Sequence, residues 1–279
     1  MLKLGFKSLL RSHSTNFTQD LLTTAAGHAS RVGRGSVRWW NGDGQMVHYR
    51  RGTSDVGLVY GILFKAGRKS EYWLPKPLEA SVVFDIGANI GVTARYLAHR
   101  FPKAVVHGFE PIPANVELAL ANSGSAPDPG RICVHPFGLG ATAGKFSFAI
   151  PTGHDANRGG YSRFGEPVHG AQGILAEIRA TEEVLGSLGG LQPDVIKIDT
   201  EGAEYDILSS FPTEVLSRVK WVYGELHSEA IEAPTTFRVL DLLSPWFDIE
   251  VHKPLRKRNW FFDACNKGIS DKFRGFCRT

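Results

Sequence analysis

A glycine-rich turn with an acidic residue follows the first strongly apolar strand of the sequence. In "VVFDIGANIGVTARYLAHRF", residues 82–101, this turn carries Asp85, Gly87, Ala88, Asn89 and Gly91. Glycines at such a position let a ligand approach the backbone. A carboxylate there repels a pyrophosphate at close range but attracts an ammonium or sulfonium group. The turn therefore predicts a site for a nucleoside-type ligand that carries a positive charge.

A second acid follows nineteen residues after Gly91, in "GFEP", where Glu110 and Pro111 end the next apolar strand. A carboxylate at this place can accept hydrogen bonds from both hydroxyls of a ribose, and by itself it would also suit NAD. Asp85 and Glu110 together favour S-adenosylmethionine, which combines a ribose with a cationic sulfur and an amino-acid tail. Leu139, in "FGLG", is a candidate for the wall against the adenine ring.

Acids and a histidine also follow two later strands. "KIDTEGAE" places Asp199 at a strand end and Glu201 and Glu204 at the start of a helix, whose positive dipole end favours acids. "GELH" places Glu225 and His227 on one face of their strand, because residues two apart share a face.

These residues suggest acid–base chemistry on an acceptor molecule. His227 or Asp199 could take a hydroxyl proton, with Glu201 beside them, and Glu225 would contact the acceptor. The set could alternatively bind a divalent metal. We do not favour that interpretation, because oxygen-rich sets also occur in metal-free acid–base sites.

Alternating strands and helices from residue 80 onward must position these side chains. The sequence predicts strands at 81–87, 104–111, 131–140, 144–151, 193–199 and 219–227, and an antiparallel pair at 247–253 and 259–265. It predicts helices at 92–101, 114–123, 181–188, 203–211 and 235–243. Five parallel strands with the terminal hairpin make an α/β fold with a doubly wound, seven-stranded sheet, whose carboxyl edge should hold the site.

Four motifs in this order resemble the FkbM family of S-adenosylmethionine-dependent methyltransferases: "FDIGANIGVTA", "HGFEPIPANVELAL", "IKIDTEGAEYDIL" and "YGELH". The resemblance covers about residues 54–262. It implies the class I methyltransferase (Rossmann-like) fold and, for many members, methylation of hydroxyls on sugars, glycolipids, polysaccharides or secondary metabolites. "HDANRGGYSRFGE" resembles the family's loop over the cofactor or acceptor, which makes acceptor contacts of Asn157, Tyr161, Ser162 and Arg163.

Charge is distributed unevenly along the chain. Residues 1–51 and 252–279 each carry a net charge of +6, which leaves −8 between them. We expect an N-terminal helical extension at 1–79 that could bind the acceptor or form oligomers, a methyltransferase domain at 80–262 and a basic tail at 263–279. The basic ends could contact an anionic substrate or a membrane surface. Nothing in the sequence indicates a nucleic-acid partner.

Three cysteines without metal-ligand spacing, and the lack of an apolar run near ~20 residues, favour a cytoplasmic protein. The sequence as a whole predicts O-methylation of a small-molecule or glycan acceptor. N-methylation is the nearest alternative, because an amine needs no strong base. Asp85 and the lack of G-x-G-x-x-G disfavour a nicotinamide-dependent oxidoreductase. An inactive cofactor-binding scaffold is a further alternative.

Overall fold

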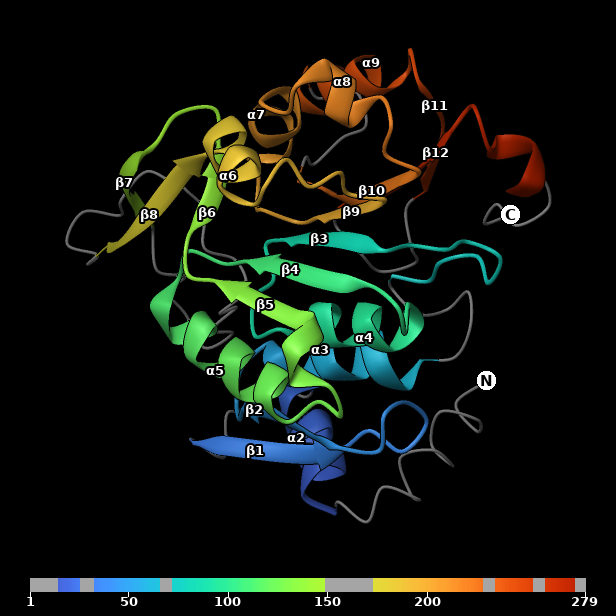
Figure 1. Ribbon diagram of the computed structural model, residues 1–279. Coiled ribbons are helices and arrows are strands. Elements are labelled where there is room, and N and C mark those ends of the chain that lie inside the picture. Colours follow the sequence, from blue (N-terminus) through green and yellow to red (C-terminus); the bar gives the residue numbers. More distant parts are fainter. Residues whose placement is uncertain are drawn as a thin grey trace.

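The computed structural model describes residues 15–25, 33–65, 72–148, 173–227, 234–252 and 259–273. A seven-stranded sheet lies at its centre, in the order β11-β12-β10-β9-β3-β4-β5 (Figure 1). Its strands are β3 (Val82–Ile86), β4 (Val105–Phe109), β5 (Ile132–His135), β9 (Val195–Ile198), β10 (Trp221–Leu226), β11 (Phe247–His252) and β12 (Trp260–Asn266).

The strand directions confirm the predicted sheet. The five strands β5, β4, β3, β9 and β10 run parallel to one another. Strand β12 pairs antiparallel with β10 on one side and with β11 on the other. This is the doubly wound, mostly parallel arrangement with a terminal antiparallel hairpin that the class I methyltransferase fold requires. The chain runs outward from β3 to β5 and then returns to β9 on the other side of β3, so the order reverses between β3 and β9. Ligands of such sheets bind outside the carboxyl ends of the strands at this point.

Helices cover both faces of the sheet, which explains why its central strands are almost continuously apolar. The helices of the core are α4 (Val92–Arg100), α5 (Pro113–Gly124), α6 (Thr181–Ser187), α7 (Glu204–Ser209), α8 (Thr213–Leu216) and α9 (Pro234–Leu243). Helices α4 and α5 lie below the sheet in Figure 1, and α7, α8 and α9 lie above it. The pleat separates two hydrophobic clusters: Val83 points into one and Phe84 into the other.

The N-terminal region contains more than the expected helices. It comprises α2 (Thr15–Ala25), the antiparallel strands β1 (Arg34–Arg38) and β2 (Met46–Arg50), α3 (Asp55–Val59) and the π-helical turn η1 (Tyr60–Phe64). Val37 and Val47 belong to the same buried cluster as Val83 and Leu97. The expected boundary at residue 79 therefore divides a continuous core, and the boundary at residue 262 falls inside β12.

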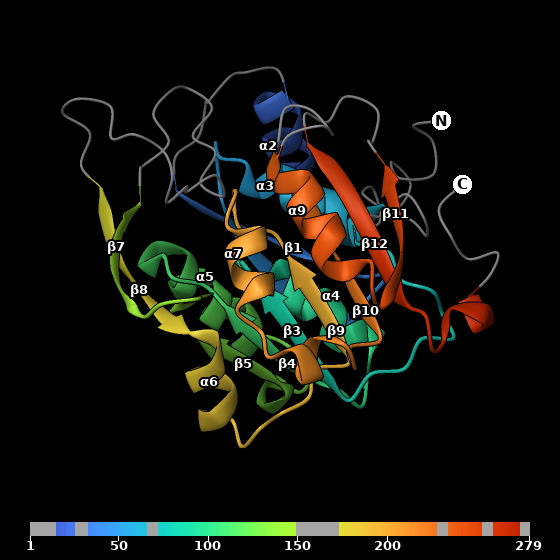
Figure 2. The same ribbon diagram turned by 90° about the horizontal axis from the view of Figure 1, so that it is seen from above.

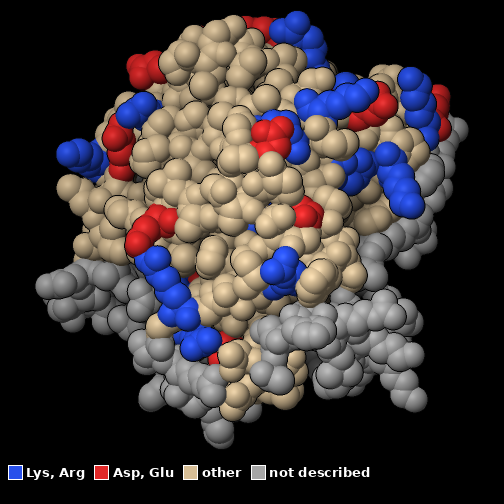
Figure 3. Space-filling model, turned by 60° about the horizontal axis from the view of Figure 1, so that its bottom comes forward, with Lys and Arg blue, Asp and Glu red and all other residues tan. Residues whose placement is uncertain are grey.

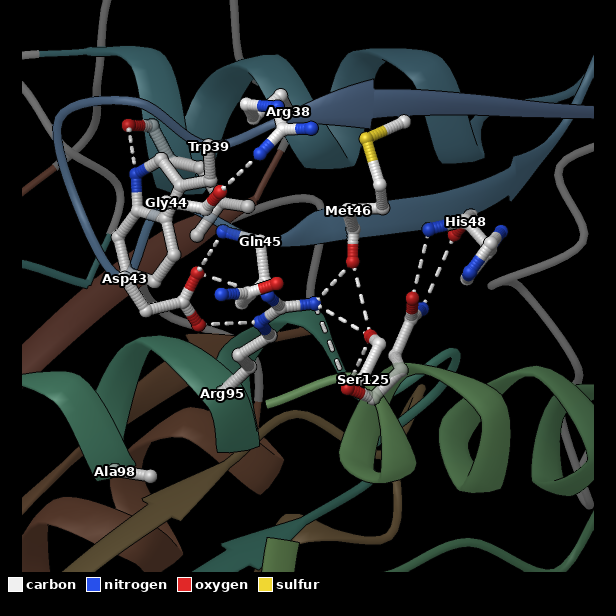
Figure 4. A network of polar contacts seen from close by, with 12 residues as sticks. Arg38, Trp39, Asp43, Gly44, Gln45, Met46, His48, Arg95, Ala98 and Ser125 are labelled. Atoms are coloured by element: carbon white, nitrogen blue, oxygen red, sulfur yellow. Dashed lines mark hydrogen bonds and ion pairs between the residues drawn. The ribbon is translucent and has the colours of Figure 1, made fainter. Parts of the chain in front are cut away.

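A buried arginine ties the β1–β2 hairpin to the core (Figure 4). The guanidinium of Arg95, on α4, donates to both carboxylate oxygens of Asp43, at 2.6 and 2.8 Å, and to the hydroxyl of Ser125 at 2.9 Å. It also donates to the carbonyl oxygen of Met46. The Arg95 side chain is 1% exposed. A charge buried this deeply requires such partners, so the hairpin and α4 hold each other in place.

The strand predicted at 131–140 is in fact two strands in different sheets. It divides into β5 and β6 (Gly138–Gly140), and β6 joins a smaller sheet with β8 (Ile174–Ala180) and β7 (Gly144–Phe148). Pro136 lies at the division, where it cannot donate a backbone hydrogen bond to a ladder. Figure 2 shows this small sheet on the side of the molecule opposite β11 and β12. Strand β8 was not predicted, although "ILAEIRA" alternates buried and exposed residues.

Basic and acidic side chains are interspersed on the face of the molecule shown in Figure 3. The basic ends of the chain lie largely outside the described residues, so their expected contacts stay a prediction. Within the described ranges, no helix has the length and apolar composition needed to cross a membrane.

Candidate active site

A cavity of about 560 Å³ lies at the carboxyl ends of β3, β4, β9 and β10. Four parts of the chain contribute to its wall: the turns after β3 and β4, the ends of β9 and β10, the small sheet of β6, β7 and β8, and the α3–η1 segment. The predicted site residues in its wall are Gly87, Asn89, Glu110, Pro111, Leu139, Asp199, Glu201, Glu225 and His227. The fold thus brings together candidates that are up to 140 residues apart in the sequence. Asn157, Tyr161, Ser162 and Arg163 lie outside the described residues.

Asp85 does not line the cavity, contrary to our expectation. Its side chain is 0% exposed and forms an ion pair with Lys197 of β9, with 3.0 Å between Oδ1 and Nζ. Lys197 Nζ also donates to the carbonyl oxygen of Gly87 at 2.7 Å. Burial acts to lower the pKa of Lys197, but the carboxylates of Asp85 and Asp199 outweigh it and raise this pKa. Asp85 therefore fixes the turn through Lys197 instead of facing a ligand.

Four of the five backbone amides of residues 87–91 are already used within the protein. The N–H groups of Gly87 and Ala88 both donate to the carbonyl oxygen of Phe109 at 3.0 Å, and that of Gly91 donates to Ala88 at 2.8 Å. The N–H of Asn89 donates to Glu110 Oε2 at 2.8 Å. A phosphate-binding turn keeps its amides free for the ligand. These four amides cannot cradle a pyrophosphate in this conformation.

Gly87 and Gly91 are needed for the backbone geometry of the turn, where a side chain would not fit. Gly87 has φ +76°, and a Cβ there would lie 1.9 Å from the carbonyl oxygen of Asp199. Gly91 has the same φ, and its Cβ would lie 3.0 Å from the Cα of Ala119 in α5. The backbones of β3 and β9 therefore approach so closely at Gly87 that this glycine sets the position of Asp199. Neither Gly91 nor Ala88 lines the cavity.

Glu110 supports the turn and also reaches the cavity. Its Oε2 accepts from the N–H of Asn89, and its Oε1 accepts from the N–H of Ile112 at 3.0 Å and from Asn115 Nδ2 at 3.2 Å. Burial raises the pKa of Glu110, and these hydrogen bonds oppose that rise. A carboxylate has about four acceptor positions. Three are taken, so a ribose would find about one and not the two that we expected.

A cluster of acids surrounds His227 at the ends of β9 and β10. His227 Nδ1 lies 2.8 Å from Glu204 Oε1, and its Nε2 lies 3.3 Å from Glu201 Oε2 and 3.6 Å from Asp199 Oδ1. Tyr72, whose hydroxyl donates to Asp199 Oδ2 at 2.7 Å, closes the cluster on another side.

Glu204 makes a contact that we did not expect, and the acceptor contact expected of Glu225 stays a prediction. Glu204 was expected to cap the helix dipole, and its Oε1 does accept from the backbone N–H of Thr200 and of Gly202. The same oxygen also holds His227, which the spacing "KIDTEGAE…GELH" could not reveal. Glu225 lies in the cavity wall, where its Oε1 accepts from Asn259 Nδ2 at 2.7 Å, outside the cluster around Nε2.

The charges and the burial of the cluster raise the pKa values of His227 and Glu201. Burial alone would lower the pKa of His227, but the hydrogen bond and charge of Glu204, with Asp199 and Glu201, raise it to about 10. Burial is the main cause that raises the pKa of Glu201 to about 7. The imidazole thus holds a proton at neutral pH when carboxylates alone surround it. This corrects our expectation of a neutral imidazole that is ready to accept a proton.

Sequence reasoning gave the N-terminal region a possible role in acceptor binding but did not identify the residues with which it lines the cavity. Four residues that line the cavity lie three or four positions apart along this segment: Ser54 just before α3, Gly57 in α3, Gly61 in η1 and Lys65 just after η1. Lysine 65 is the one Lys or Arg in this wall among the described residues. The sequence signal was a helical spacing of small residues, which by itself is common.

The comparisons with known proteins agree with this arrangement. The model of the family described as "Methyltransferase FkbM domain" matches residues 85–253, which is more than half of the chain. The chain belongs to the FkbM methyltransferase family. The match includes the turn after β3, the Glu110 strand end and the acid cluster, and it confirms the predicted family.

Three relatives show how far the likeness to known proteins extends along the chain. The AMB antimetabolite synthetase AmbE of Pseudomonas aeruginosa is 28% identical over 213 residues, which are 63% of this chain and 10% of AmbE. The hexuronic acid methyltransferase AglP of Haloferax volcanii is 30% identical over 151 residues, 54% of this chain and 57% of AglP. The 2-O-methyltransferase NoeI of Sinorhizobium fredii is 28% identical over 190 residues, 62% of this chain and 74% of NoeI. The chain thus spans less than two thirds of the length of the first two.

Proposed function

We propose that this protein transfers the methyl group of S-adenosylmethionine to a hydroxyl oxygen of a sugar, a glycan or glycolipid, or a secondary metabolite. The observation that carries the proposal is the cavity itself. It joins the glycine turn after β3 and the Glu110 end of β4 to an acid–base cluster at the ends of β9 and β10. Membership of the FkbM methyltransferase family supports the reaction type.

Charge and hydrogen bonding in the cavity favour a sulfonium cofactor over a dinucleotide. Four acidic side chains line the cavity, those of Glu110, Asp199, Glu201 and Glu225. Among the described residues of its wall, Lys65 is the one Lys or Arg. Four of the five amides of the turn at residues 87–91 donate within the protein, so the turn does not offer the row of free N–H groups that a pyrophosphate needs. Asn89 Oδ1 is buried in the cavity wall without a hydrogen-bond partner among the described residues, so it could accept from the ligand.

Bound S-adenosylmethionine would supply an electrophilic methyl carbon on its sulfonium sulfur. The protein has to hold the acceptor oxygen about 3 Å from that carbon and in line with the carbon–sulfur bond. Transfer of that methyl group would leave the electron pair of the carbon–sulfur bond on sulfur, with S-adenosylhomocysteine as the second product. The hydroxyl proton passes to a carboxylate of Asp199 or Glu201, which line this part of the cavity, because the imidazole beside them already holds a proton.

Two relatives support oxygen as the methyl acceptor. One is named a hexuronic acid methyltransferase and the other a 2-O-methyltransferase. An amine acceptor would need no proton acceptor before its attack. A set of carboxylates gathered beside the cavity is therefore better explained by a hydroxyl.

Thermal denaturation with ligands tests the cofactor. S-adenosylhomocysteine at 100 times its dissociation constant should stabilise the native state by about 2.7 kcal/mol, and NAD should not. Glu110→Ala should reduce this shift, because the ribose loses an acceptor and Asn89 loses its support. Glu117→Ala is the matched control, since Glu117 lies on α5 and its side chain is 64% exposed. A folded Glu110→Ala protein with an undiminished shift would remove Glu110 from the site, and a shift with NAD alone would overturn the proposal.

A further inference from the structure

We propose that Asp199, Glu201 and His227 form a binding site for a hexacoordinate divalent cation, Mg²⁺ or Mn²⁺. One ligand atom from each of the three residues lies within 4.8 Å of the other two. These atoms are carboxylate oxygens of Asp199 and Glu201 and the Nε2 nitrogen of His227. Carboxylates suit Mg²⁺ and Mn²⁺, and imidazole is the commonest protein ligand of the first-row metals.

The distances in the cluster match those of a coordination shell. Adjacent donors of an octahedral shell with a radius of about 2.1 Å lie about 3.0 Å apart. Nε2 of His227 lies 3.3 Å from the Glu201 oxygen and 3.6 Å from the Asp199 oxygen. Contractions of a few tenths of an ångström would bring His227 Nε2 to this spacing from both acids, and the two carboxylate oxygens lie within 4.8 Å of each other.

A second carboxylate orients the imidazole for this role. Glu204 Oε1, 2.8 Å from Nδ1 of His227, fixes the ring so that Nε2 points at the two acids. A carboxylate behind a histidine is the usual support of a metal-binding imidazole, because it fixes the tautomer and increases the basicity of the ligating nitrogen. Glu204 is itself held by the backbone N–H groups of Thr200 and Gly202. The orientation is therefore built into the start of α7.

Three protein ligands leave coordination positions open on the side of the cavity. Asp199, Glu201 and His227 all belong to the cavity wall, and the side chains of Asp199 and Glu201 are 22% and 27% exposed. A site with three protein ligands and open positions is typical of catalytic metals, since water or substrate completes the shell. In structural metal sites, by contrast, protein ligands fill all coordination positions.

The role of the cation rests on the proposed methyl transfer. A divalent cation at this place would bind the acceptor through its hydroxyl oxygen, orient it toward the methyl carbon and make its proton more acidic. With Asp199, Glu201 and His227 engaged as ligands, that proton would leave to water in the open cavity. The acceptor class that fits is a hydroxyl with a second oxygen close to it, as in a sugar diol or a hydroxy acid, because two oxygens can occupy two neighbouring open positions.

Direct binding of Mn²⁺ tests the site without any turnover. The full chain, freed of metal with a chelator and then dialysed, is titrated with MnCl₂, and the electron paramagnetic resonance signal of free Mn²⁺ gives the bound fraction. The titration is done without and with S-adenosylhomocysteine, and we expect one equivalent to bind. Asp199→Asn and Glu201→Gln should weaken binding at least tenfold. Glu204→Gln should weaken it about 10-fold to 100-fold through the ring orientation.

Glu225→Gln is the matched control, because it removes a carboxylate from the same cavity but outside the cluster. It should change Mn²⁺ affinity less than threefold. The inference is overturned if the folded wild-type protein binds no Mn²⁺ in either titration, or if Glu225→Gln weakens binding as much as Glu201→Gln does. The cation site and the proposed function can be refuted independently of each other. Mn²⁺ binding without an S-adenosylhomocysteine shift refutes the function alone, and the shift without Mn²⁺ binding refutes the cation site alone.

Discussion

Replacement of Lys197 by methionine should strongly destabilise the protein, although this residue does not line the cavity. Lys197 and Asp85 are 2% and 0% exposed and form an ion pair across β9 and β3. Removal of one partner leaves the other charge buried without compensation, which costs about 3–5 kcal/mol. Total stabilities of proteins are only about 5–15 kcal/mol, so this is a large fraction of the free energy of unfolding.

The measurement is urea denaturation followed by circular dichroism. With a slope of about 3 kcal/mol/M, a loss of this size lowers the urea midpoint by about 1 M or more. Lys220→Met is the matched control. Lys220 also forms an ion pair with an aspartate, Asp194, at 2.9 Å, but its side chain is 41% exposed. An exposed pair contributes about 0–1 kcal/mol.

The double variant Asp85→Asn/Lys197→Met tests the cause of the loss. If an uncompensated carboxylate destabilises the single variant, removal of that charge should recover at least half of the lost stability. The reasoning is refuted if Lys197→Met costs no more than Lys220→Met. It is also refuted if the double variant is less stable than Lys197→Met alone, because Lys197 would then act through packing only.

Two other predictions follow from the structure. Burial, with smaller effects from neighbouring basic side chains, lowers the pKa of His135 to about 4. The unfolded chain protonates this histidine near its ordinary pKa of 6.5, so the free energy of unfolding should fall as pH drops from about 7 to about 4. His135→Asn should flatten that decline in urea midpoints, and an unchanged pH dependence would contradict the assignment. Gly87→Ala should cost at least about 2 kcal/mol, because its Cβ would lie 1.9 Å from the Asp199 carbonyl oxygen at φ +76°. Gly57→Ala, whose Cβ would have no heavy atom within 4 Å, should be neutral or stabilising by up to about 1 kcal/mol, and equal melting temperatures of the two variants would refute this.

The sequence by itself determined the sheet and the places of its functional edge. Short, mostly apolar runs such as "VVFDI" and "VIKI" are typical of strands that are covered on both faces. The segments between them have apolar residues three and four positions apart, which is typical of helices. The ends of these runs located Glu110, Asp199 and His227, because parallel strands place their carboxyl ends at one edge. Local pattern was sufficient for these conclusions.

Only the tertiary structure decided which charges meet. Asp85 and Lys197 are each acceptable in their own strand, and the register of β3 against β9 pairs them and removes Asp85 from the cavity. The same holds for Glu204 and His227, which lie on different elements and meet at 2.8 Å. The energy of a charge depends on its distance to other charges and on burial, and both are set by contacts between residues that are distant in sequence. For this reason the sequence located the acids, and the fold determined whether each one supports the turn, orients the histidine or faces the ligand.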